Sequence, residues 1–111
     1  MAAIAIPRFT GLRHESTVKA EGSTATSIIS AARVQEAASG KSVGAGAMTN
    51  TGAPGDAGFI DAKYMLVPAA PVYTIGYSGN LLTVSWPTAA GGDYAGDTLT
   101  LTEGQEFIPT P

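Results

Sequence analysis

The chain has 111 residues, of which 44% are hydrophobic and 14% charged, with a formal net charge of −3 and no cysteine. A chain this short buries only about two-thirds of its unfolded surface, so we expect one domain with a thin core. The lack of cysteine excludes a disulfide framework, a thiol nucleophile and a Cys-based zinc site, and no apolar run approaches the roughly 20 residues that a membrane span needs.

Residues 1–26 mix isolated apolar residues with small polar and charged ones and show no sustained hydrophobic period. This pattern predicts an extended N-terminal arm, distinct from a single β-rich domain over residues 27–111. The apolar run Met1–Ile6 is shorter than the core of a secretion signal and lacks a basic flank, so we expect no such signal. Charge is uneven along the chain: residues 1–41 hold five basic and three acidic side chains, a net +2, whereas residues 42–111 hold one basic and six acidic, a net −5.

Residues 27–39 are rich in alanine and are followed by Gly40, which favours a helix with a glycine at its C-terminal cap. The β-branched Ile28, Ile29 and Val34 would fit equally well in two short strands, so both alternatives stay open. The next segment, residues 40–58, contains six glycines and one proline. That composition predicts a long loop.

Residues 59–67 are the first segment that alternates in the manner of a strand. The side chains that would face the core are Ile60, Ala62, Tyr64 and Leu66. Further along, Thr98–Thr102 alternates threonine with leucine and predicts a final, half-buried strand.

The strongest signal is Val72–Trp86, where two β-rich runs are separated by Gly79 and Asn80, a pair that fits a two-residue type II′ turn. Pairing Ser78 with Leu81 then fixes the register of a hairpin. One face of that hairpin would carry the large side chains Tyr73, Ile75, Tyr77, Leu82, Val84 and Trp86, and the other face Thr74, Gly76, Thr83 and Ser85. The fold class we expect is therefore mainly β: a small β-sandwich or barrel-like domain with an extended N-terminal arm and room for one short helix.

The sequence offers no set of side chains for ordinary enzyme chemistry. His14 is the only histidine and has no serine or aspartate near it in a recognisable arrangement, so we expect it to be solvated or at an interface. The stretch Gly44–Thr49 begins like a dinucleotide-binding loop but has threonine where the third glycine should be. We therefore expect no enzyme activity and no cofactor.

Two other constellations have a functional and a structural interpretation. Paired aspartates, at positions 93 and 97 and at positions 56 and 61, could offer oxygen atoms to a cation, but neither pair matches a calcium loop, so we expect no metal site and assign them to turns. The aromatic face of the hairpin could stack on sugars or bases if it were exposed, but its apolar neighbours favour burial. The basic residues are too few and too mixed with glutamate for a nucleic-acid interface, so we expect neither nucleic acid nor a membrane as partner.

Several features occur together: a mixed-charge arm over Ala2–Gly22, no cysteine, turns rich in Thr, Ala and Gly, a compact β portion and a proline-ended tail. In size and organisation the chain resembles small virion proteins of tailed bacteriophages, most of all the capsid decoration or cement proteins. The resemblance implies a homo-oligomeric protein, with a trimer favoured, that binds the major capsid protein on the outer surface of the virion and stabilises the capsid lattice. A phage tail, neck or fibre component and a small carbohydrate-binding β module are the alternatives.

Arg8, Phe9 and Arg13 are the residues that we expect to contact a partner subunit. They combine an aromatic anchor with two guanidinium groups, and both types are enriched among the residues that dominate protein interfaces.

Overall fold

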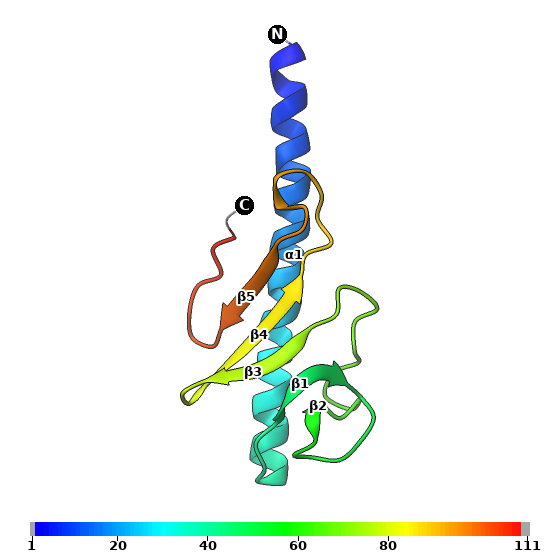
Figure 1. The fold of residues 1–111 in the computed structure, drawn as a ribbon, viewed down its shortest axis with the longest axis vertical. Helices are drawn as coiled ribbons and strands as arrows, with labels where there is room; N and C mark the ends of the chain where they lie inside the picture. The colour runs from blue at the N-terminus through cyan, green and yellow to red at the C-terminus, as the bar shows by residue number, and fades with distance from the viewer. Residues whose placement is uncertain (1, 110–111) are drawn as a thin grey trace.

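The structure, a computed structural model, describes the backbone of residues 2–109 and the side chains of residues 14–109. Within these residues a long helix, α1 (Ala2–Ser39), is followed by a single mixed sheet of five strands. The strands are β1 (Gly44–Thr49), β2 (Ala57–Phe59), β3 (Thr74–Ser78), β4 (Leu81–Pro87) and β5 (Thr98–Thr102), and a short 3-10 helix, η1 (Gly92–Tyr94), precedes β5. The strand order is β2-β1-β3-β4-β5, with β1 and β2 parallel and the other pairs antiparallel. Figure 1 shows α1 behind one face of the sheet, with its N-terminal turns extending beyond it.

One stripe of α1 is buried against the sheet, and this burial explains why the segment is helical. Val18, Ala25, Ile28 and Ala32 are each at most 1% exposed and recur at the three- and four-residue spacing of one helix face. The helix stops at Gly40, whose φ of +74° is left-handed and whose N–H donates to the Glu36 carbonyl oxygen (2.8 Å). The helix predicted over residues 27–39 is confirmed, and the alternative of two strands is wrong.

The extended arm predicted over residues 1–26 is wrong for the described residues 2–26, which belong to the same continuous helix. The buried stripe already begins at Val18, but the small Ser and Thr residues around it hide the period. The hydroxyls of Thr24, Thr26 and Ser27 donate to carbonyl oxygens one turn earlier (3.1–3.2 Å), so these weak helix formers keep helical geometry. Packing against the sheet, which local propensity does not include, decides the conformation.

The β3–β4 hairpin has the predicted register, because Ser78 pairs with Leu81, Tyr77 with Leu82, and Ile75 with Val84. Gly79 has a φ of +62°, and Asn80, like every other described residue that is not glycine, does not have a positive φ, as a type II′ turn with glycine first requires. Of the six side chains expected in the core, all are buried except Tyr77, which is 37% exposed. The final strand is also confirmed as β5, with both of its leucines buried.

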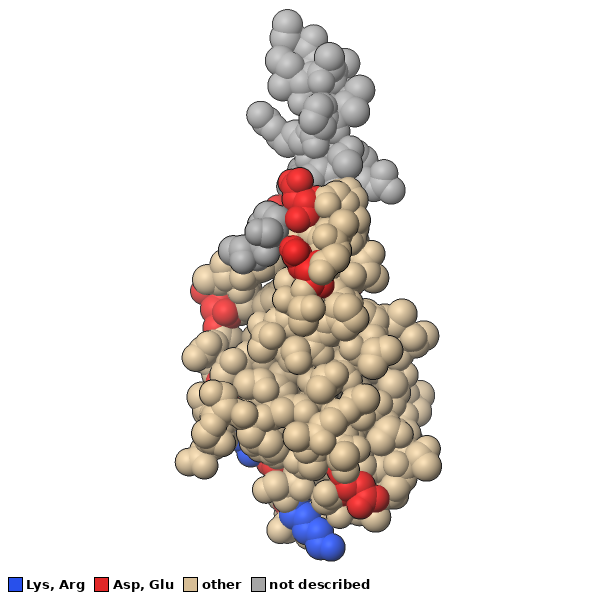
Figure 2. All heavy atoms as spheres, in the orientation of Figure 1, with Lys and Arg blue, Asp and Glu red and all other residues tan. Residues whose placement is uncertain are grey.

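The sheet is open and has α1 on one face only, so the predicted β-sandwich or barrel is wrong and the mainly β class holds only in part. The other face carries Thr74, Gly76, Thr83, Ser85 and Thr100, none of which is fully buried. Figure 2, seen from this side, shows a surface that is mostly uncharged. Small polar side chains offer too little apolar area to hold a second sheet, so the single long helix supplies the second layer of the core.

The segment between α1 and β3 differs most from expectation. The predicted loop over residues 40–58 contains β1 and most of β2, and the predicted strand over residues 59–67 ends at Phe59. The chain then turns, and Leu66, expected in the core, is 70% exposed. The side chain of Asn50 fixes this turn: its amide nitrogen donates to the carbonyl oxygens of Ile60 and Met65 (both 2.9 Å), and its amide oxygen accepts from the N–H of Val67 (2.9 Å).

Candidate functional site

Several polar side chains join α1 to the sheet, and one cluster is centred on Glu21, which is only 6% exposed. Its Oε1 atom accepts hydrogen bonds from Trp86 Nε1 (3.1 Å) and Thr88 Oγ1 (2.7 Å), and its Oε2 atom accepts one from the N–H of Ala89 (2.9 Å). The Tyr73 hydroxyl donates to the backbone carbonyl oxygen of Glu21 (3.2 Å). Both carboxylate oxygens are occupied inside the chain, so Glu21 holds α1 on the sheet.

The aromatic face of the hairpin is closed by the same contacts. Tyr73 and Trp86 are 2% and 1% exposed, and their ring centroids are 5.3 Å apart. Phe107, from the C-terminal tail, packs against Trp86 with a centroid distance of 5.5 Å. Stacking on a sugar or a base needs an open ring face, so the predicted burial is confirmed and the two rings offer no surface to a carbohydrate.

The second cluster is centred on Arg33. Its Nε and Nη2 atoms donate to the two carboxylate oxygens of Glu103 (2.8 and 2.5 Å), which makes a bidentate pair. Its Nη1 atom donates to Glu36 (2.6 Å), which also accepts a hydrogen bond from the Tyr77 hydroxyl (2.6 Å), and its Nη2 atom donates to the Asn80 carbonyl oxygen (2.8 Å). The cluster therefore ties α1 to the β3–β4 turn and to the residue that follows β5.

These contacts shift the pKa values within the cluster. Hydrogen bonds from Arg33 lower the pKa of Glu103 below its usual value. Burial acts to raise the pKa of Glu36, but the hydrogen bonds from Tyr77 and Arg33 outweigh it, so the pKa of Glu36 is also lowered. Burial and the bond to Glu36 raise the pKa of Tyr77 to about 12. At neutral pH the cluster thus holds two carboxylates against one guanidinium and carries surplus negative charge.

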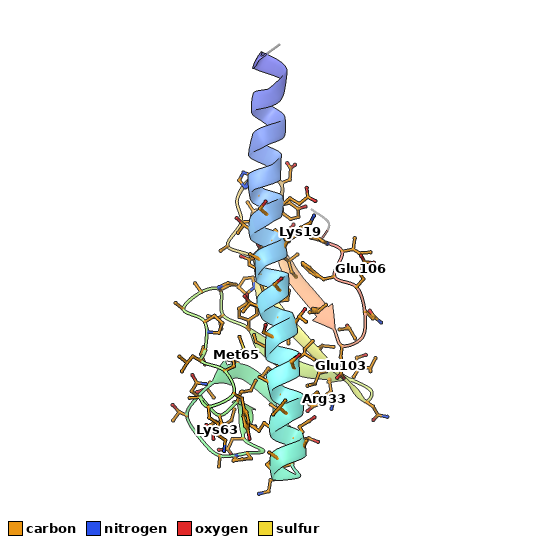
Figure 3. All side chains as sticks on the ribbon, turned by 180° about the vertical axis from the view of Figure 1, so that it is seen from behind. Lys19, Arg33, Lys63, Met65, Glu103 and Glu106 are labelled. Atoms are coloured by element: carbon orange, nitrogen blue, oxygen red, sulfur yellow. The ribbon has the colours of Figure 1, made fainter. Side chains whose placement is uncertain are left out.

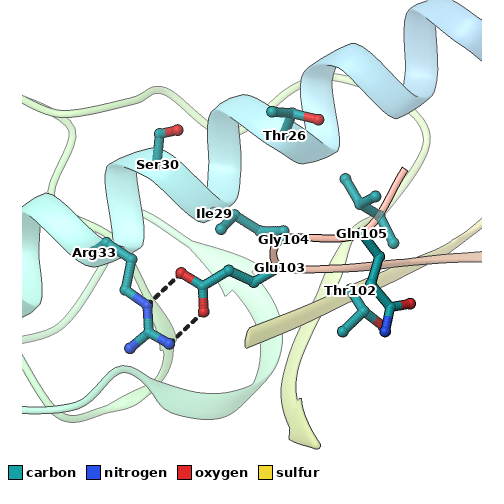
Figure 4. Close-up of a pocket in the computed structure, with 9 residues that line it drawn as sticks. Thr26, Ile29, Ser30, Arg33, Thr102, Glu103, Gly104 and Gln105 are labelled. Atoms are coloured by element: carbon teal, nitrogen blue, oxygen red, sulfur yellow. Dashed lines mark hydrogen bonds and ion pairs between the residues drawn. The ribbon is translucent and has the colours of Figure 1, made fainter. Parts of the chain in front are cut away.

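A groove of about 320 Å³ opens beside this cluster, between α1 and the chain that leaves β5. Thr26, Ile29 and Ser30 line it from the helix, and residues 101–105 line it from the other side. Figure 4 shows the Arg33–Glu103 pair at one end of the groove. A second groove of about 340 Å³ lies between α1 and Tyr64 and has no charged residue in its lining.

The residues predicted to contact a partner, Arg8, Phe9 and Arg13, have their backbone in the part of α1 that extends beyond the sheet (Figure 1). Their side chains lie outside the described residues, so their role stays a prediction. The sequence interpretation did not identify Glu21, Arg33 and Glu103 as important. The signal for Glu21 was its position on the buried helix stripe, between Val18 and Ala25.

Three of the other candidate residues, His14, Asp56 and Asp61, make structural contacts. His14 lies against the backbone of Gly91 and Gly92, where its ring atoms would meet any added Cβ atom. Asp56 accepts a hydrogen bond from the N–H of Ala53 (2.9 Å) and Asp61 one from the N–H of Lys63 (3.0 Å), as turn-forming aspartates do. Among residues 2–109, no group of three or more His, Asp or Glu side chains is arranged to hold a metal ion.

In the described part of the chain, no helix combines the length and the hydropathy that crossing a membrane requires. Comparison of the chain with models of known families, with curated proteins and with solved structures finds no match.

Proposed function

We propose that this protein is a structural subunit, not an enzyme, which enters a larger assembly through the N-terminal end of α1. The observation that carries this proposal is the length of that helix. The molecule measures 58 × 26 × 20 Å, and a 38-residue helix is about 57 Å long at about 1.5 Å per residue. The helix alone sets the long dimension, because the sheet covers only its C-terminal part (Figure 1).

The projecting part of α1, residues 2–13, continues a helix that is already packed on the sheet, so it does not have to nucleate alone. Most helical stability in proteins nevertheless comes from tertiary packing, so this end would gain stability from a partner. This part includes an apolar stretch, residues 2–6. Burial of these residues against other subunits would supply that stabilisation.

The kind of assembly that best fits this shape is a helical filament, such as a pilus or a tail fibre. The projecting end holds Arg8 and Arg13 and no acidic residue, whereas residues 14–111 hold four basic and nine acidic residues, a net charge of −5. Two such different surfaces suit a head-to-tail contact, in which one end of a subunit binds another part of its neighbour. Contacts of that type extend into open helical arrays unless the rotation happens to close a ring.

The resemblance to capsid decoration proteins favours a second candidate, in which the projecting helix binds the major capsid protein on the surface of a phage virion. The low charge of the chain and its uncharged sheet face (Figure 2) are compatible with close packing in such a lattice. In this candidate the part that contacts the capsid is helical, and a trimer remains the proposed oligomer.

The test compares the wild-type chain with the variant Ile4→Asp/Ile6→Asp by sedimentation velocity and negative-stain microscopy. We expect the wild-type chain to form large particles or filaments and the variant to stay monomeric, because two charges in the apolar stretch prevent its burial. The matched control is Leu66→Asp/Ile108→Asp, which places two charges at exposed apolar positions (70% and 69%) of the body and should assemble normally. Assembly that persists in the Ile4→Asp/Ile6→Asp variant would show that the projecting helix is not the contact.

A further inference from the structure

The groove beside Arg33 has an acidic rim. Arg33, Glu36 and Glu103 form the connected cluster at its end, and Glu106 is exposed one residue beyond the groove lining. Figure 3 shows Glu103 and Glu106 on the same side of α1. Three carboxylates against one guanidinium give this rim a net charge of −2, while Ile29 and Leu101, which are 8% and 5% exposed, supply the apolar part of the groove lining.

The projecting end of α1 has the complementary chemistry. It combines an apolar stretch with Arg8 and Arg13, a net charge of +2. It cannot occupy the groove of its own chain, because α1 is one continuous helix and its N-terminal turns point away from the sheet (Figure 1). The same segment of another copy has no such restriction.

We infer that the groove between α1 and residues 101–105 is the docking site for the N-terminal end of α1 from a second copy of this chain, with Arg8 and Arg13 opposite the rim of Glu103 and Glu106. The inference rests on the proposed function, because it names the surface that receives the projecting helix. The uncharged groove beside Tyr64 would also accept apolar side chains, but it offers nothing to the two guanidinium groups. Opposite charges across such a contact fix its register and speed association.

A charge swap in the full-length chain tests the inference. The arm variant is Arg8→Glu/Arg13→Glu, and the groove variant is Gln105→Arg/Glu106→Arg, at two exposed positions. Glu103 is left unchanged, because its pair with Arg33 holds the fold together. The matched control is Asp93→Arg/Ala95→Arg, which changes the net charge by the same +3 at exposed positions of the η1 turn, away from the groove.

Self-association is measured by sedimentation velocity at low salt, where surface charges are least screened. We expect the arm variant and the groove variant each to weaken association by about tenfold or more, because each places like charges opposite one another. The control should associate like the wild-type chain. A mixture of the two variants, and the chain that carries all four substitutions, should regain association, because opposite charges again face each other.

Failure of this inference is distinguishable from failure of the proposed function. If Ile4→Asp/Ile6→Asp abolishes assembly but the groove variant behaves like the control, the projecting helix is the contact and it binds elsewhere, so the docking site is wrong. If the arm and groove variants both weaken association but the mixture does not restore it, the two surfaces do not face each other and the inference is also wrong. A wild-type chain that stays monomeric at every concentration would overturn the inference, and binding of that monomer to capsids would leave only the virion candidate.

Discussion

Replacement of Glu21 by alanine should remove much of the stability of the fold. The substitution deprives three donors of their acceptor: Trp86 Nε1, Thr88 Oγ1 and the N–H of Ala89. A buried donor left without a partner costs about 1–3 kcal/mol, which applies in full to Trp86 Nε1, whereas the Thr88 hydroxyl and the Ala89 N–H are only part-buried and can reach water, so the expected loss is about 2–4 kcal/mol. Small domains have a total unfolding free energy of about 5–15 kcal/mol, so this loss would be visible in any unfolding assay.

The assay is urea unfolding followed by the fluorescence of Trp86, the only tryptophan in the chain, together with far-ultraviolet circular dichroism. Glu21→Gln should lower the free energy of unfolding by less than Glu21→Ala, because the amide oxygen can still accept the hydrogen bond from Trp86. Only the bond from the N–H of Ala89 is lost, since an amide nitrogen cannot accept it. The control is Glu15→Ala, which breaks only an exposed pair with Lys19 (3.4 Å) and should change the unfolding free energy by less than about 0.5 kcal/mol. A Glu21→Ala chain within about 1 kcal/mol of wild type would refute the role assigned to this cluster.

Two further predictions follow from other parts of the fold. The pKa values of Glu36 and Glu103 are lowered in the folded chain, so their contribution to the free energy of unfolding is complete above the unfolded pKa of about 4.5. This contribution is lost as the pH falls from there through the folded-state pKa, and thermal melts should show the decline. The variant Glu103→Gln, although less stable at neutral pH, should show a flatter dependence of the melting temperature on pH. Gly58→Ala should lower the melting temperature much more than Gly96→Ala, although both residues have positive φ, because a Cβ atom at residue 58 would overlap the Ala47 carbonyl oxygen whereas residue 96 faces open space. Equal melting temperatures for the two alanine variants would show that β1 and β2 do not approach as closely as described.

The sequence predicted the elements whose structure depends on nearby residues. The β3–β4 hairpin follows from Gly79 at the first turn position and from the alternation on either side of it, so its register needed no information from the rest of the chain. The helix after residue 27 and its end at Gly40 likewise follow from local composition and a glycine cap. The alternation of threonine and leucine was sufficient for β5.

Local signals failed where packing between distant segments decides the conformation. Residues 14–26 are small and polar and have little helical preference of their own, and they become helical because Val18, Glu21 and Ala25 meet the sheet. The glycine-rich segment after Gly40 was interpreted as loop, because its composition gives no sign that β1 pairs with β3. The turn after Phe59 depends on Asn50, which is ten residues from one of its partners and fifteen from another.

Composition and neighbouring residues are enough to establish that the chain is small, cysteine-free, low in charge and built around one hairpin. They also establish the contrast between a basic N-terminal end and an acidic remainder. The packing of α1 on the sheet, in contrast, makes this end a projecting helix and places a groove with an acidic rim between α1 and the residues after β5. Local signals cannot give this arrangement, because Arg33 and Glu103 are 70 residues apart and meet only when α1 packs on the sheet.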